Sequence, residues 1–122
     1  MTRLQGGRLP VVVTGDFNCR PGSVPNRTFV ENGFEDAYLA LGGADDADAA
    51  TFHGFYRLPY SLLRLSDRAR RQKPLRIDWI LCRSGAQLVR VEGHAILRDR
   101  GTRSGPFPSD HYPVLATLSL SD

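Results

Sequence analysis

The alternation of apolar and polar residues predicts several short strands. Residues 11–13 form a β-branched apolar run, which is typical of a buried strand. Further strands are predicted over residues 76–82, 87–97 and 112–120, and a shorter one over residues 51–55. In the last of the long strands every second residue is apolar, which places these side chains on one face.

Helical signals are fewer. Residues 25–33 predict a short helix closed by Gly33, and residues 34–41 predict a second helical turn that ends at Gly42. Strands and short helices together predict a mixed α/β fold, of the α+β class. We expect one mixed, mainly antiparallel sheet with its helices on one face.

The two most apolar strands, over residues 11–13 and 77–82, carry apolar side chains on both faces. Strands of this type belong to sheets that are covered on both sides. The predicted helices supply cover for one side only. We therefore expect the missing layer to come from another chain or from another part of the same protein.

Polar side chains follow the first strand directly. Gly15 is expected to let the chain turn, and Asp16 and Asn18 are then presented together at the strand end. The acid can hold or deprotonate a water molecule, and the amide can orient that water or a substrate oxygen. An ordinary Gly-Asp turn is the alternative interpretation.

Asp78 is the most unusual residue of the strand over 76–82, because a carboxylate in an apolar strand is costly unless it is paired. Its expected partner is a histidine or a metal ion, and His111 lies at the start of a strand that could be its neighbour. An aspartate would hold the imidazole in one tautomer and stabilise its protonated form. A structural salt bridge to Arg76 or Arg83 is the alternative.

Four motifs then follow one another along the chain: Gly-Asp-Phe-Asn at 15–18, Thr-Phe-His-Gly-Phe at 51–55, Arg-Ile-Asp-Trp-Ile at 76–80 and Ser-Asp-His-Tyr-Pro-Val at 109–114. In this order they resemble the endonuclease/exonuclease/phosphatase superfamily, the metal-dependent phosphoesterases related to DNase I and exonuclease III. The second motif is most similar to the bacterial deadenylase-like branch. The resemblance covers nearly the whole chain.

The resemblance implies a role for each matching residue. Asp16 would activate or position the attacking water, and Asn18 would orient that water and the phosphoryl group. Asp78 would pair with His111, which would contact the scissile phosphate. Asp110, together with Asp16, would bind Mg²⁺ or Mn²⁺, hard cations that prefer oxygen ligands.

Two further residues are candidates for contacts with the substrate phosphate. Arg76 precedes Asp78 in the third motif, and His53 lies in the second. The alternative for His53 is a hydrogen bond within the core.

The resemblance also implies a larger fold than these residues provide. Family members are four-layer α/β/β/α sandwiches, and their first half carries an asparagine and a glutamate that is a principal metal ligand. We expect residues 1–122 to form a single partial domain, the C-terminal half of such a sandwich, with weak or no hydrolysis on its own. The alternative is a non-catalytic module that forms a homodimer or binds another partner through its uncovered sheet.

Charge adds one more feature. The chain of 122 residues carries a net charge of +3, but residues 57–76 hold seven basic residues and one acid. Such a segment suits partners that bear phosphate, including nucleic acid, and a solvated loop is the alternative. Nucleic acids, phospholipid headgroups and small phosphates are all substrates compatible with the resemblance.

Composition limits the remaining classes. Cys19 and Cys82 have neither metal-ligand spacing nor a disulfide framework pattern, so we expect both to be reduced. No stretch approaches the ~20 apolar residues needed to span a membrane. We therefore expect a cytoplasmic protein.

Overall fold

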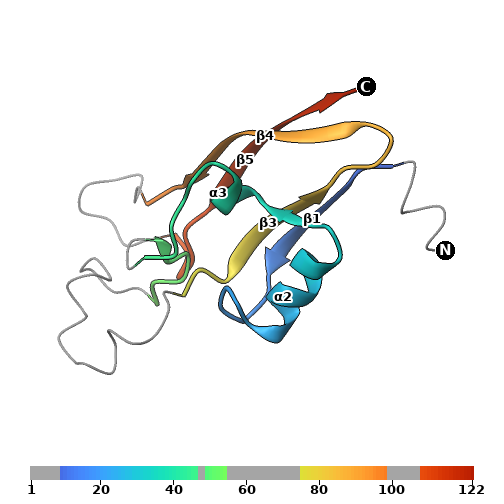
Figure 1. Cartoon of the computed structure of the whole chain (residues 1–122). Coiled ribbons are helices and arrows are strands. Elements are labelled where there is room, and N and C mark those ends of the chain that lie inside the picture. Colours follow the sequence, from blue (N-terminus) through green and yellow to red (C-terminus); the bar gives the residue numbers. More distant parts are fainter. Residues whose placement is uncertain (1–8, 47–48, 55–74, 99–107) are drawn as a thin grey trace.

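The computed structural model describes residues 9–46, 49–54, 75–98 and 108–122. Its elements confirm the α+β class, since all strand pairs are antiparallel and the helices are short (Figure 1). In chain order the elements are β1 (Val11–Asp16), α2 (Val24–Glu31), β2 (Glu35–Asp36), α3 (Ala37–Ala40), β3 (Asp78–Arg83), β4 (Leu88–Ile96) and β5 (Val114–Ser121).

The first sheet has the order β1-β3-β2, with β3 in the middle. Strand β1 runs antiparallel to β3 along its whole length, and the register places Asp16 directly opposite Asp78. On the other edge of β3, Glu35 pairs with Cys82. The middle strand supplies most of the buried side chains of this sheet, because Trp79, Leu81 and Cys82 are all buried.

Strands β4 and β5 form a separate two-stranded sheet, so the expectation of one sheet is wrong for the described residues. The reason is geometric. Strand β1 occupies one edge of β3, the two residues of β2 occupy part of the other at Leu81 and Cys82, and β4 pairs with β5 instead. Only four residues, 84–87, separate β3 from β4.

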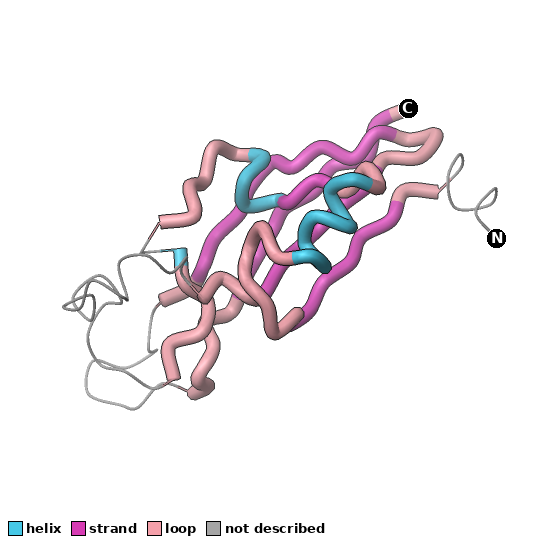
Figure 2. Tube along the Cα trace, turned by 60° about the horizontal axis from the view of Figure 1, so that its bottom comes forward, coloured by secondary structure: helices cyan, strands magenta, loops and turns pink. Residues whose placement is uncertain are grey.

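The two sheets share one core. Cys82 of β3 and Val91 of β4 belong to a single buried cluster with Ala37 of α3. Partly buried apolar residues pack against this cluster from β3, β4 and β5, namely Ile80, Val89, Ala116 and Leu118. The long strands of both sheets follow a common direction (Figure 2), as in aligned packing of one sheet on another.

Cover of the first sheet is incomplete at β1. Val11 and Val13 are half-buried, whereas Val12 is 49% exposed. This strand was expected to be buried on both faces, and within the described residues it is not. Leu115 and Leu120 of β5 also leave more than half of their surface accessible.

Helix α2 matches the predicted helix over residues 25–33 within one or two residues. Pro25 occupies its first turn, where a missing backbone N–H removes no hydrogen bond of the helix. The chain leaves the helix through Gly33, whose positive φ of 85° suits glycine, and the amide of Phe34 bonds back to the carbonyl of Phe29.

The second predicted helix is only partly present. Glu35 and Asp36 form strand β2 because the free edge of β3 offers them backbone partners. Helix α3 then begins after Asp36, whose carboxylate accepts a hydrogen bond from the amide of Tyr38 at 3.0 Å. Tertiary pairing therefore overrides the local helical preference.

Candidate active site

Strands β1 and β3 bring the first two candidate carboxylates together. Asp16 ends β1 and Asp78 begins β3, and the two residues are direct partners in the register. The amide of Phe17 also donates to the carbonyl of Ile77 at 2.9 Å, so the pairing continues one residue beyond the strand. A rigid strand pair therefore holds both carboxylates.

The turn after β1 falls later than expected. Gly15 lies inside the strand, opposite Trp79, and does not form the turn. Instead Asn18 has a φ of 53°, and among the described residues no other residue except glycine has a positive φ. The backbone N–H of Asn18 donates to the Asp16 carboxylate at 2.9 Å. Asparagine tolerates this left-handed conformation better than most residues, and the local hydrogen bond supports it.

Aromatic packing fixes this turn to the protein interior. The ring of Phe17 stacks on Trp79 with centroids 4.5 Å apart and an interplanar angle of 15°. Its edge meets Phe29 of α2 at 5.6 Å. Because Phe17 lies between Asp16 and Asn18, this packing restrains both polar side chains.

His111 is the partner of Asp78. The Nδ1 atom of the imidazole lies 2.8 Å from Asp78 Oδ2, a hydrogen-bond distance. The pairing that the sequence predicted is therefore present, and neither Arg76 nor Arg83 takes the place of the histidine. The hydrogen bond to the Asp78 carboxylate is the main cause that raises the pKa of His111 above its ordinary value of 6.5, against a smaller opposing effect of burial.

The other ring nitrogen of His111 faces two more carboxylates. Its Nε2 atom lies 3.7 Å from Asp16 Oδ2 and 3.9 Å from Asp110 Oδ1. Ligand atoms of Asp16, Asp78 and His111 all lie within 4.8 Å of one another. All of these side chains are partly exposed, so a substrate or ion has access to them.

The segment over 51–54 links the parts of this site. The amides of His53 and Gly54 donate to the carbonyl of Asp110, and the amide of Tyr112 donates to the carbonyl of Thr51. A strand was expected over residues 51–55. The described residues 51–54 instead form one isolated bridge, between Phe52 and His111. Sequence periodicity gave no sign of this linking role, because a single bridge leaves no alternation to detect.

His53 is 8% exposed, and its ring lies 4.5 Å from that of Tyr112. Burial is the main cause that lowers the pKa of His53, while a hydrogen bond with the backbone of Ser109 and the charge of Asp110 act in the opposite direction. This burial favours the structural interpretation of His53 over contact with a substrate.

Arg76 was expected to bind substrate phosphate, and the structure corrects this. The side chain is 1% exposed, and its guanidinium lies 2.8 Å from a carboxylate oxygen of Asp36 and 2.6 Å from one of Asp45. It also stacks over the ring of Tyr38 at 4.6 Å. A guanidinium enclosed in this way already has its anionic partners.

The rest of the basic segment, over residues 57–74, lies outside the described residues. Both cysteines are described and are free thiols, as expected from their spacing. Among the described residues no helix is long and apolar enough to cross a membrane.

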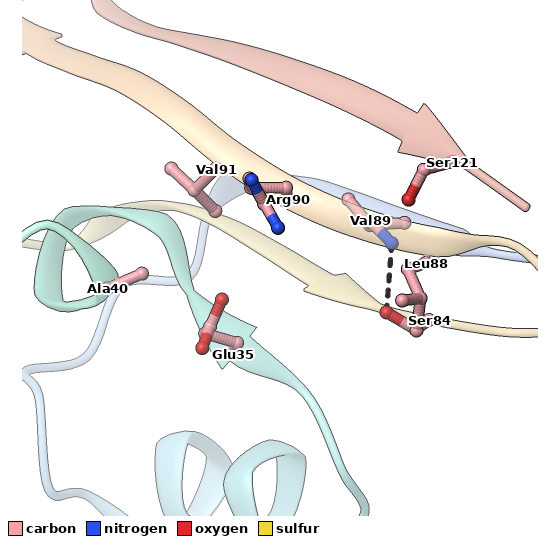
Figure 3. A pocket seen from close by; sticks show the side chains of 8 residues that line it. All are labelled: Glu35, Ala40, Ser84, Leu88, Val89, Arg90, Val91 and Ser121. Carbon is pink, nitrogen blue, oxygen red and sulfur yellow. Dashed lines mark hydrogen bonds between the residues drawn. The ribbon is translucent and has the colours of Figure 1, made fainter.

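A pocket of about 280 Å³ lies elsewhere, near the start of β4 and beside β2 (Figure 3). The expected site residues do not line it. Its lining residues are Glu35, Ala40, Ser84, Leu88, Val89, Arg90, Val91 and Ser121.

An imidazole near three carboxylates, two of them at the paired ends of β1 and β3, defines a candidate active site. The chain belongs to the Endonuclease/Exonuclease/phosphatase family, whose pattern matches residues 2–111.

Comparison with individual proteins shows a solved structure with a similar fold. No curated protein matches the chain. Among solved structures, the chain is similar to "a functionally unknown conserved protein from Enterococcus faecalis V583", with 25% identity and a TM-score of 0.60. The similarity covers 90% of this chain and 36% of that protein, so these residues span about a third of its length.

Proposed function

We propose that this chain carries the catalytic carboxylates and histidine of a phosphoesterase that depends on a divalent metal ion. One observation carries the proposal: His111 binds Asp78 through one ring nitrogen and turns the other toward Asp16 and Asp110. When doubly protonated, an imidazole held in this way presents an N–H group toward the space between the two carboxylates. The substrate class is a phosphodiester or phosphomonoester.

Asp16 and Asn18 would handle the attacking water. The carboxylate of Asp16 would accept a proton from the water, and the carboxamide of Asn18 would orient the water in line with the phosphorus atom. The turn supports this role, since the backbone of Asn18 is bonded to Asp16 and both residues are exposed.

His111 would act on the phosphate. With Asp78 bound at Nδ1, the second nitrogen is a donor only in the doubly protonated form, which the raised pKa of His111 favours. Such a donor would stabilise the negative charge that develops on the phosphoryl oxygens.

The donor set fits a hard divalent cation. Asp16 and Asp110 offer oxygen atoms on the same side of His111, and both carboxylates are partly exposed. Asp78 is already engaged by the imidazole, so Asp16 and Asp110 are the residues that would hold Mg²⁺ or Mn²⁺. When bound, such an ion neutralises charge on the phosphate oxygens and the leaving group.

We further propose that residues 1–122 are one part of a larger sandwich domain, corresponding to its C-terminal half. The apolar surface supports this, because Val12, Leu115 and Leu120 expose about half of their area. So does the comparison, since the similar protein is much longer than the matched region. On the motif over 51–55 we place the chain in the deadenylase-like branch.

Binding of Mn²⁺ by the purified chain tests this proposal, measured by calorimetry. We expect weak but saturable binding, because two carboxylates make a sparse site, and loss of binding in Asp16→Asn and in Asp110→Asn. Asp122→Asn serves as the control, since its carboxylate belongs to the C-terminal end of the chain, beside Gln87. Binding that is absent, or unchanged in both site variants, would refute the metal site.

Hydrolysis of a nitrophenyl phosphodiester and a nitrophenyl phosphomonoester provides the second measurement. We expect slow or undetectable turnover by the chain alone. Any turnover should need Mg²⁺ or Mn²⁺ and should disappear in His111→Gln. Fast metal-dependent turnover by the chain alone would contradict the proposal that a further part of the domain is needed.

Light scattering then identifies what covers the apolar surface. A monomer is expected if a further part of the same domain normally covers it. A stable dimer that is lost in Val12→Asp would instead support pairing between two copies.

A further inference from the structure

Thr51 occupies a buried position between two parts of the candidate site. The residue is 0% exposed, and its hydroxyl oxygen accepts hydrogen bonds from the amides of Ile77 at 3.0 Å and Asp78 at 3.1 Å. The same hydroxyl lies 3.3 Å from the carbonyl of Leu75, to which it donates. One side chain therefore engages three backbone groups at the entry to β3.

These bonds determine where Asp78 begins its strand. The carbonyl of Ile77 accepts from the amide of Phe17, and Thr51 accepts from the N–H of Ile77 itself. The amide of Asp78 is bound directly by Thr51. The backbone that carries the carboxylate is thus fixed on both sides.

The backbone of the same segment holds the histidine. The carbonyl of Thr51 accepts from the amide of Tyr112 at 2.7 Å, and Phe52 forms a bridge with His111. The amide of His53 donates to the carbonyl of Asp110 at 3.0 Å. Both members of the Asp78–His111 pair are therefore positioned from residues 51–53.

We propose that Thr51 is a positioning residue of the active site, whose hydroxyl places Asp78 at hydrogen-bonding distance from His111. The residue acts through Asp78 and does not touch the substrate. The effect of Thr51 on hydrolysis rests on the proposed function. The effect of Thr51 on the position of Asp78 rests on the hydrogen bonds alone.

Three substitutions separate the hydroxyl from the packing of the side chain. Thr51→Val keeps the volume and removes the hydroxyl, whereas Thr51→Ser keeps the hydroxyl and removes a methyl group. If the valine variant fails to fold, Thr51→Ala compared with Thr51→Ser isolates the hydroxyl in the same way.

Amide hydrogen exchange, measured by NMR on the chain without metal, is the first test. Without the hydroxyl, the amides of Ile77 and Asp78 lose their acceptor, and we expect their exchange to accelerate by about tenfold or more. Amides of β4 and β5 provide the internal control, and Thr51→Ser should behave as the wild type. Equal protection of both amides in all variants would overturn the positioning role.

A double-mutant cycle on hydrolysis is the second test. We expect Thr51→Val to lower kcat with little change in KM, and to have no further effect once Asp78 is replaced by asparagine. A loss of the same size in both backgrounds would show a general structural effect and would overturn the inference. If the wild type shows no detectable hydrolysis, as the proposed function allows for the chain alone, the Mn²⁺ titration decides the proposed function and the exchange measurement decides the role of Thr51.

Discussion

Replacing Arg76 by methionine removes a buried charge that two carboxylates surround. Asp36 and Asp45 lie within 2.8 Å and 2.6 Å of the guanidinium, and the Asp36 side chain is only 2% exposed. Although burial lowers the pKa of Arg76, the hydrogen bonds that it donates to Asp45 and Asp36 outweigh this effect and raise the pKa above its ordinary value. The arginine is therefore charged in the folded protein.

The cost of the substitution follows from the burial of its partners. Asp45 is partly exposed and can be solvated by water, whereas Asp36 would be left buried without a counter-charge. Breaking a buried pair by removing one partner costs about 3–5 kcal/mol. This is a large part of the ~5–15 kcal/mol that stabilises a typical domain. Methionine keeps much of the apolar volume, so the loss reports mainly on the charge.

Urea unfolding followed by the fluorescence of Trp79, the single tryptophan, measures this loss. Arg90→Met is the matched control, since Arg90 is exposed and its replacement should change stability by about 0.5 kcal/mol or less. Adding Asp36→Asn to Arg76→Met should recover part of the loss because it removes the orphaned charge.

A loss below about 1 kcal/mol in Arg76→Met would refute the reasoning from burial. It would also reopen the expectation that the arginine serves a substrate phosphate. The two interpretations differ clearly, since a phosphate-binding arginine would affect hydrolysis and leave stability nearly unchanged.

Further predictions concern the histidines and the turn at Asn18. In an NMR titration with chelator present, His111 should titrate above pH 6.5 and His53 and His94 below it, and the reverse order would contradict the Asp78 pairing and the burial of the other two. The pKa of His111 is higher in the folded than in the unfolded chain. The contribution of His111 to stability is therefore complete below pH 6.5 and is lost as the pH rises through the pKa of the folded state. Urea midpoints measured at several pH values should show this loss for the wild type and a smaller loss for His111→Gln. Asn18→Ala should be about 1 kcal/mol less stable than Asn18→Gly in urea unfolding, because a φ of 53° strains alanine and does not strain glycine; equal stabilities would argue against a positive φ.

Much of the site could be predicted from local sequence. Asp78 stands out because a carboxylate in an apolar strand needs a partner, and a histidine at the start of another strand is an available one. Asp16 and Asn18 stand out because they follow a β-branched run directly. These signals need only short windows of sequence.

Other features depend on contacts between distant segments and leave no local signal. Glu35 lies in a helical pattern yet becomes a strand, because the edge of β3 is available to it. Arg76 resembles a ligand for phosphate until the carboxylates of Asp36 and Asp45 are seen around it. Thr51 was part of a recognised motif, but its hydrogen bonds to β3 become visible only in three dimensions.

The separation of Asp78 and His111 along the chain also sets the order in which the candidate site can be completed during synthesis. Asp16 and Asp78 can be joined as soon as β1 and β3 have left the ribosome, whereas His111 lies 33 residues after Asp78. Because chains emerge from the N-terminus and fold progressively, the carboxylates are in place before their imidazole is made. Until then Asp78 lacks the hydrogen-bond partner that it has in the folded protein, so the site stays incomplete until residue 111 has been translated.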